Sequence, residues 1–329
     1  MQENLLHNGN TVLKKALDQY LSSQENVVKI QPIDEEQSIP VEDFKASYVE
    51  HKRPVVIRGG MQKSAAFKKW DFDFFEREKG GLDIVSNLYD VTNTHRCSMQ
   101  DLIAAIRTGK SSYPVYLQEW WFQSDNQDML SDVEVPEYFS DDQNNVVFGY
   151  MNHTLWIGQQ GAFTPIHQDT VHANLWTAQL RGSKHWILID PCAALYADDE
   201  GNCDFTSLLR EQNHCVYQTT LNEGDILYMP HRWWHRAETL SNAISMNTFY
   251  ITPEILQPYI RDVLSIPLAA SLNQNLLKDQ DPMRYNICMQ RAEILAKNMG
   301  LDIQNILRID TSGQAKNGIY TKQAGAGDA

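Results

Sequence analysis

A histidine and an aspartate stand two positions apart at His167 and Asp169, within the segment TPIHQD. Side chains at positions i and i+2 of a β-strand point to the same face, so an imidazole and a carboxylate would converge there. Two imidazoles and one carboxylate on one octahedral face suit non-haem Fe(II) and leave positions open for other molecules. The pair therefore predicts a metal site that needs a second histidine from elsewhere in the chain.

His235 is the histidine best placed to complete this set. It follows the strand pattern DILYMP (225–230) and a short turn, so we expect it at the mouth of a strand. His172 would lie on the opposite face of an ideal strand from Asp169, so it is not expected to bind the metal. His231 is a second histidine near His235, and we expect His235 to be the ligand of the two. An isolated H-x-D pair is a weak signal, because an ordinary surface strand with two polar side chains explains it as well.

The segments that must position these residues have a β-rich pattern. Between residues 113 and 251, short runs of aromatic and β-branched residues alternate with turn signals such as Asp190-Pro191. Many short strands of this kind are typical of a sandwich or barrel and not of alternating β-α-β units. The predicted strands are VYLQEWWF, VVFGYM, HTLWIGQ, ANLWTAQL, HWILID, CVYQTTL, DILYMP and AISMNTFYI.

Helical patterns flank this region. Apolar spacing predicts a helix over 12–24, and residues 98–109 form a second helix with Ser98 as its N-cap, while PVVIRG (54–59) predicts a buried strand. After residue 252, an apolar stripe over 255–264 and the segment 283–300 predict two further helices.

We therefore expect four parts along the chain. Residues 1–112 form an α/β segment that packs on the barrel, and residues 113–252 form the barrel core. Residues 253–310 form C-terminal helices, and the small, polar residues of 311–329 form a flexible tail.

Composition limits the class of protein. The chain has 329 residues and a net charge of −14, which argues against a protein that tracks nucleic-acid phosphates. No apolar run approaches the roughly 20 residues that span a bilayer, and the first residues lack a secretory pattern. The five cysteines form no C-x-x-C pair, so we expect reduced thiols and a cytoplasmic protein without membrane contact.

Several ordered motifs resemble those of JmjC-type cupin oxygenases. They are TPIHQD (164–169), LRGSKHW (180–186), GDILYMPHRWWH (224–235) and NTFY (247–250). The closest resemblance is to the cupin-like branch that includes the asparaginyl hydroxylase acting on hypoxia-inducible factor, over residues 40 to 252. It implies a double-stranded β-helix, a cupin or jelly-roll fold that is mainly β. It also implies Fe(II) bound by His167, Asp169 and His235, with 2-oxoglutarate and O₂ as co-substrates.

The same resemblance implies residues that hold 2-oxoglutarate. Lys184 matches the family lysine that binds the far carboxylate, and Tyr116 and Thr164 match hydroxyl groups that assist it. Asn247 matches an asparagine near the iron-bound end of the co-substrate. Without the resemblance, a lysine at a strand end would be expected to extend towards solvent, and the Tyr and Thr to be packing residues.

Asn174 is a further candidate for this pocket, with an ambiguity of register. Asn174 and Lys184 are separated by an even number of positions, whereas the corresponding family residues are separated by an odd number. A difference of one position places a side chain on the opposite face of a strand. Either a bulge in TVHANLW restores the geometry, or another residue, such as Thr177, takes the place. For substrate contacts the sequence suggests Gln118 and Trp234.

The resemblance implies hydroxylation of a protein or peptide side chain, with succinate and CO₂ as co-products. A small molecule or natural product is the alternative substrate, and a cupin-like binding or scaffold protein without catalysis is the alternative of a different class. A zinc-dependent cupin isomerase is a third. The C-terminal helices predict a homodimer, as similar helices do in the asparaginyl hydroxylase.

Overall fold

The structure is a computed structural model that describes residues 29–87, 94–109, 114–124, 126–140, 152–169, 171–193, 196–197, 203–204, 215–272 and 282–298. The chain forms two compact units. The first comprises residues 1–140, 153–169 and 173–250, and the second comprises residues 141–152, 170–172 and 251–329.

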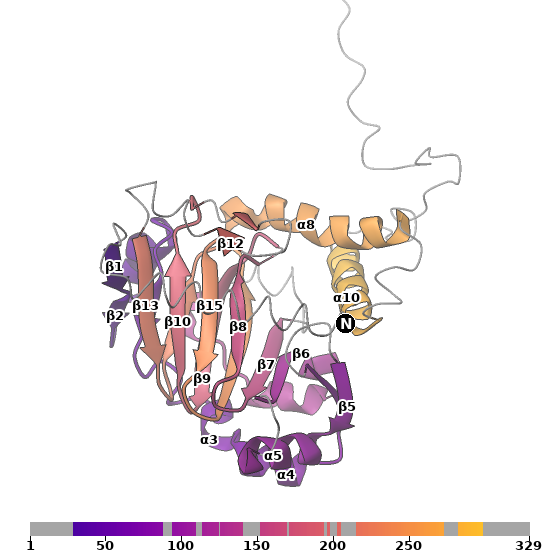
Figure 1. Ribbon diagram of the computed structural model, residues 1–329. Helices are drawn as coiled ribbons and strands as arrows, with labels where there is room; N and C mark the ends of the chain where they lie inside the picture. Colours follow the sequence, from indigo (N-terminus) through magenta and orange to yellow (C-terminus); the bar gives the residue numbers. More distant parts are fainter. Residues whose placement is uncertain are drawn as a thin grey trace, which may run out of the picture. The chain divides into compact units, whose positions relative to one another are not determined.

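Two sheets build the first unit (Figure 1). The smaller contains, in spatial order, β1 (Lys29–Pro32), β13 (Cys215–Leu221), β10 (Lys184–Ile189), β15 (Trp234–Thr239) and β8 (Phe163–His167). The larger contains β2 (Asp34–Glu36), β3 (Val55–Ile57), β14 (Ile226–Met229), β9 (Asn174–Arg181), β16 (Ala243–Tyr250), β7 (His153–Gly158), β6 (Tyr116–Trp120), β4 (Asp83–Asn87) and β5 (Thr94–Ser98). A separate pair joins β11 (Tyr196–Ala197) and β12 (Cys203–Asp204).

The chain crosses repeatedly from one sheet to the other. Strands β7, β9, β14 and β16 belong to the larger sheet, and β8, β10, β13 and β15 belong to the smaller. Successive strands wound in this way form the double-stranded β-helix, so the predicted fold class is confirmed.

Alternation along the strands separates two apolar clusters. On β9, Trp176 and Ala178 belong to a cluster shared with the N-terminal helices, whereas Leu175 belongs to a cluster with Trp186 of β10 and Leu227 of β14. Because successive side chains point to opposite faces, the second cluster fills the space between the two sheets. Odd-numbered residues of β9 therefore face the interior of the barrel.

Short helices contribute to the first of these clusters. They are α2 (Val41–Phe44), the π-helical η1 (Lys45–Val49), α3 (Ala65–Lys69), α4 (Phe72–Glu78), α5 (Met99–Thr108) and the 3-10 turns η2 (Phe122–Ser124), η3 (Gln127–Asp132) and η4 (Glu137–Phe139). Ser98 caps α5 by accepting a hydrogen bond from the Asp101 N–H, as predicted, and Gly109 ends the helix in the left-handed conformation. The predicted helix 12–24 and the predicted strand 146–151 lie outside the described residues.

The second unit contains α8 (Pro253–Leu272) and α10 (Pro282–Asn298), which contact each other and confirm the two helices predicted there. Ile255, Tyr259 and Val263, one stripe of α8, are buried. None of the helices among the described residues is long and apolar enough to cross a membrane. The expected tail, 311–329, lies outside the described residues.

Candidate metal centre

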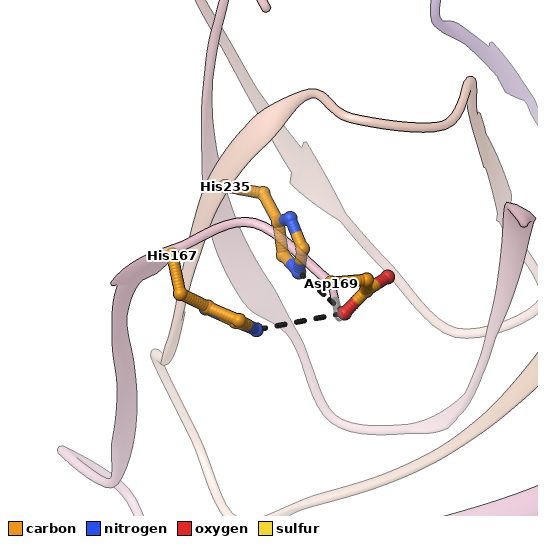
Figure 2. A group of neighbouring side chains, drawn as sticks. All are labelled: His167, Asp169 and His235. Carbon is orange, nitrogen blue, oxygen red and sulfur yellow. Dashed lines mark ion pairs between the residues drawn. The ribbon is translucent and has the colours of Figure 1, made fainter. Parts of the chain in front are cut away.

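Three side chains converge at one end of the barrel interior (Figure 2). His167, Asp169 and His235 each offer one ligand atom, and these atoms all lie within 4.8 Å of one another. The Nε2 atoms of His167 and His235 lie 3.7 Å and 3.8 Å from the same Asp169 oxygen, Oδ1. The structure therefore brings together the three residues that the sequence selected.

Strand pairing places the two histidines. His167 on β8 is the direct partner of His235 on β15, and their ring centroids lie 4.1 Å apart. Asp169 differs from the expectation, because β8 ends at His167 and the aspartate lies beyond it. The convergence of His167 and Asp169 therefore does not come from strand alternation, as the i, i+2 argument assumed, but from the path of the chain after the strand.

Backbone carbonyl groups fix the tautomers of both rings. Nδ1 of His167 donates to the carbonyl of Pro165 at 2.8 Å, and Nδ1 of His235 donates to the carbonyl of Trp233 at 3.1 Å. A carbonyl oxygen can only accept, so each Nδ1 carries a hydrogen, and Nε2 is the nitrogen whose lone pair is available to a metal ion when the ring is neutral. Those lone pairs are on the atoms nearest Asp169.

Burial, together with the nearby His167 ring, lowers the pKa of His235 to about 4, so the imidazole stays neutral at physiological pH. Two imidazole nitrogens and one carboxylate form a donor set that fits a divalent transition metal of the non-haem iron type. The residues present thus fit an Fe(II) ion.

Lys184 is buried inside the same barrel, 2% exposed. Its Nζ donates to the hydroxyl oxygen of Ser245 at 2.7 Å and to that of Tyr116 at 3.1 Å, both neutral groups. Burial lowers the pKa of Lys184 to about 7, and among the described residues no carboxylate is ion-paired with it. A buried amine that donates to two hydroxyl groups and can take up a proton fits a site for an anionic carboxylate.

Tyr116 is held against a glycine of the neighbouring strand. It pairs with Gly158 on β7, where a Cβ atom would lie 2.9 Å from the tyrosine ring. Its hydroxyl is hydrogen-bonded to that of Thr164, and burial raises its pKa, so the group remains protonated. Tyr116, Thr164 and Lys184 therefore meet, as the resemblance implied.

Asn247 and Thr177 are direct partners on β16 and β9, so their side chains share the interior face. Thr177 is 1% exposed, and its hydroxyl has no hydrogen-bond partner among the described residues. Asn174 lies an odd number of positions from Thr177, and its Oδ1 instead accepts a hydrogen bond from the His231 N–H at 2.9 Å. The register shift in this ladder falls between Gln179 and Arg181, and the ladder is regular from Asn174 to Gln179. Of the two alternatives left open by the sequence, the geometry favours Thr177.

Gln118, Trp234 and His172 are not among the three converging side chains. Gln118 is buried on β6, beside a bulge where Glu119 has a φ of +50°. Trp234 donates from Nε1 to the carbonyl of Ala193 at 2.9 Å. His172 belongs to the second unit, where Asp262 of α8 accepts hydrogen bonds from its backbone N–H and its Nδ1.

The sequence motifs do not identify Ser245, whose hydroxyl accepts a hydrogen bond from Lys184, as the hydroxyl of Tyr116 does. Strand alternation could have identified it, because Ser245 stands two positions before Asn247 and alternate residues of a strand share a face. In the sequence, Gly182 is identified only as part of the motif LRGSKHW (180–186). Its φ of +67° and a Cβ position 2.1 Å from the Asn242 carbonyl oxygen show that the turn leading to Lys184 requires glycine.

Comparison with known proteins agrees with this architecture. Residues 41–254 match the family described as the cupin-like domain. The chain is 22% identical over 229 residues to arginine-specific demethylase JMJ22 of Arabidopsis thaliana. It is 23% identical over 285 residues to the bifunctional arginine demethylase and lysyl-hydroxylase psr-1 of Caenorhabditis elegans. It is 26% identical over 182 residues to 2-oxoglutarate and iron-dependent oxygenase JMJD4 of Danio rerio.

These alignments cover 64%, 78% and 49% of this chain, respectively. They cover 44%, 70% and 43% of the relatives, so the chain spans less than half the length of two of the three. The family match, in contrast, extends over most of the chain and includes all the strands that carry the converging side chains. This chain belongs to the cupin-like domain family.

Proposed function

We propose that the chain is an Fe(II)- and 2-oxoglutarate-dependent dioxygenase that hydroxylates a side chain of a protein or peptide. The observation that carries the proposal is the convergence of two imidazole Nε2 atoms and one carboxylate within 4.8 Å. The buried Lys184 in the same barrel supports a 2-oxo diacid as the co-substrate.

Each residue has a defined role in this proposal. His167, Asp169 and His235 hold the iron and leave its other coordination positions to 2-oxoglutarate and O₂. Lys184, assisted by the hydroxyl groups of Tyr116 and Thr164, binds the far carboxylate, and Asn247 and Thr177 contact the iron-bound end. When bound, iron with O₂ couples the conversion of 2-oxoglutarate to succinate and CO₂ with insertion of one oxygen atom into a substrate C–H bond.

A protein substrate is supported by the names of two relatives, which describe an arginine demethylase and a bifunctional arginine demethylase and lysyl-hydroxylase. Hydroxylation of a methyl group on nitrogen also begins demethylation, because the product loses formaldehyde. Kinship with the asparaginyl-hydroxylase branch rests on the resemblance of the motifs alone. We propose that Gln118 and Trp234 contact the substrate.

The direct test is turnover of 2-oxoglutarate without substrate. The purified chain, supplied with Fe(II), ascorbate and O₂, is expected to form succinate, and Asp169→Ala is expected to abolish it. A screen of peptides and metabolites for products that gain one oxygen atom then identifies the substrate class. No iron binding and no succinate would contradict the proposal and favour a binding or scaffold protein, whereas products found only among metabolites would replace the peptide by a small molecule.

We further propose a cytoplasmic homodimer that binds no nucleic acid. Cys97, Cys192 and Cys215 form no disulfide with one another or with any other side chain that the structure describes, which supports a reducing compartment. Part of the α8 stripe is already buried within one chain, so a second copy would meet other residues of α8 and α10. Light scattering at micromolar concentration tests the dimer, and a monomer would contradict it.

A further inference from the structure

The loop that carries Asp169 is not positioned by strand pairing, unlike the two histidines. His167 and His235 lie on paired strands, and the ladder between β8 and β15 fixes their backbones. Asp169 follows the end of β8, so strand pairing does not determine where its carboxylate lies. Another contact must hold this loop if the three donors are to be in place before a metal ion arrives.

Gln168, the middle residue of the H-x-D motif, makes such a contact. Its Nε2 donates a hydrogen bond of 2.6 Å to the backbone carbonyl of Arg232. Gln168 is joined by one peptide bond to Asp169, and Arg232 lies in the turn between β14 and β15, shortly before His235. The amide therefore links the two chain segments that supply all three ligand atoms.

The turn that accepts this bond is itself held in place. Arg232 adopts a left-handed conformation, with a φ of +69°, which costs free energy for a residue other than glycine. Asn174, 3% exposed on β9, accepts a hydrogen bond from the N–H of His231 at 2.9 Å and lies 3.3 Å from the Nδ1 of that ring. Asn174 thus stabilises the turn whose carbonyl group receives Gln168.

We propose that Gln168 is a positioning residue of the metal centre, and that Asn174 acts through the same turn; this inference rests on the proposed function. The amide of Gln168 fixes the Asp169 loop to the segment that leads to His235, so that the carboxylate meets both Nε2 atoms without reorganisation. Removing a partner that orients metal ligands weakens metal binding by about 10- to 100-fold in metalloproteins. Because this bond is exposed to solvent, we expect an effect at the lower end of that range, about 10-fold.

The test measures Co(II) binding by the full chain, with Co(II) as an oxidation-resistant probe for Fe(II). Gln168→Met keeps the length of the side chain and loses the N–H donor, and Gln168→Asn keeps the amide but is one methylene too short. Both are expected to weaken Co(II) binding about 10-fold and to change the visible absorption of the bound Co(II) ion. Gln100→Ala is the matched control, since Gln100 is exposed on α5, and it is expected to bind Co(II) as the wild type does.

A double-mutant cycle tests whether Gln168 and Asn174 affect Co(II) binding through the same turn. Asn174→Ala is expected to weaken Co(II) binding, and the double variant with Gln168→Met to lose less than the product of the two single effects. Asn174→Asp, which keeps the acceptor oxygen, is expected to retain more affinity than Asn174→Ala. Circular dichroism and urea midpoints establish that each variant is folded.

The outcomes separate this inference from the proposed function. If the wild type binds no Co(II), the proposed function fails and the positioning role fails with it. If the wild type binds Co(II) and folded Gln168→Met and Gln168→Asn variants match its affinity and spectrum, only the role of Gln168 is overturned. Strictly multiplicative effects in the cycle would overturn the role assigned to Asn174.

Discussion

His167 and His235 face each other directly across β8 and β15, with ring centroids 4.1 Å apart and both Nε2 atoms near Asp169. The ladder that pairs these strands exists only in the folded chain. The metal site and the fold of the barrel should therefore be thermodynamically linked.

Metal binding is expected to stabilise the folded state. At a free Co(II) concentration of about 100 times Kd, the free energy of unfolding should rise by about 2.7 kcal/mol, because the unfolded chain has no preformed site. Urea unfolding with Co(II) and with a chelator measures the difference. The folded variant His235→Ala should show no such gain, and an equal gain in that variant would place the metal elsewhere.

Lys184→Met is expected to weaken binding of 2-oxoglutarate at least about 100-fold, because one carboxylate of the ligand would enter the barrel without its cation. The methionine has a similar length and is uncharged, so the barrel should remain folded. Anaerobic calorimetry with Co(II) present measures the affinity. Binding of pyruvate, which lacks the far carboxylate, should change little, and unchanged 2-oxoglutarate affinity would exclude Lys184 from the pocket.

Binding of 2-oxoglutarate is expected to take up a proton at pH 8. Burial lowers the pKa of Lys184 to about 7 in the free protein, so the amine is mostly neutral at pH 8 and must be charged to pair with a carboxylate. At pH 6 the amine is already charged and little uptake should occur. Calorimetry in two buffers of different ionisation enthalpy measures the uptake, and none at pH 8 would contradict a role for this amine.

His153 should make the metal-free protein sensitive to acid. Its ring bonds to Thr248 at 2.8 Å, and burial lowers its pKa to about 4, below the ordinary 6.5. The unfolded chain therefore binds more protons, and the histidine's contribution is present above pH 6.5 and is lost as the pH falls towards 4. The loss should approach about 3 kcal/mol.

His153→Asn, which cannot titrate in this range, provides the comparison for that effect. Urea unfolding of both proteins with a chelator, from pH 7 to pH 4.5, should show a shallower decline in the variant. Parallel declines would assign the acid sensitivity to other groups.

Local patterns in the sequence predicted the strands and several contacts of the site. Lys184, Tyr116 and Thr164 meet as the motifs implied, and each lies on a strand of the barrel. The position of Asp169 was not predictable in this way, since the strand ends before it. Contacts such as Gln168 with Arg232 depend on loop conformation and on strands distant in sequence, which no local pattern encodes.

Asn174 illustrates the same limit. Its type suggested a co-substrate contact, but its amide supports the turn at His231, and Thr177 takes the interior face instead. Only the register between β9 and β16 distinguishes these two residues, and a shift of one position would exchange their faces.

The most direct test of the central claim is the visible spectrum of the anaerobic protein with Fe(II), before and after addition of 2-oxoglutarate. A 2-oxo acid that chelates Fe(II) through its carboxylate and keto oxygens produces a metal-to-ligand charge-transfer band. We predict that this band appears with the wild type at one equivalent of iron and is absent in Asp169→Ala. No band with the wild type, or an undiminished band in Asp169→Ala, would contradict an iron and 2-oxoglutarate centre at His167, Asp169 and His235.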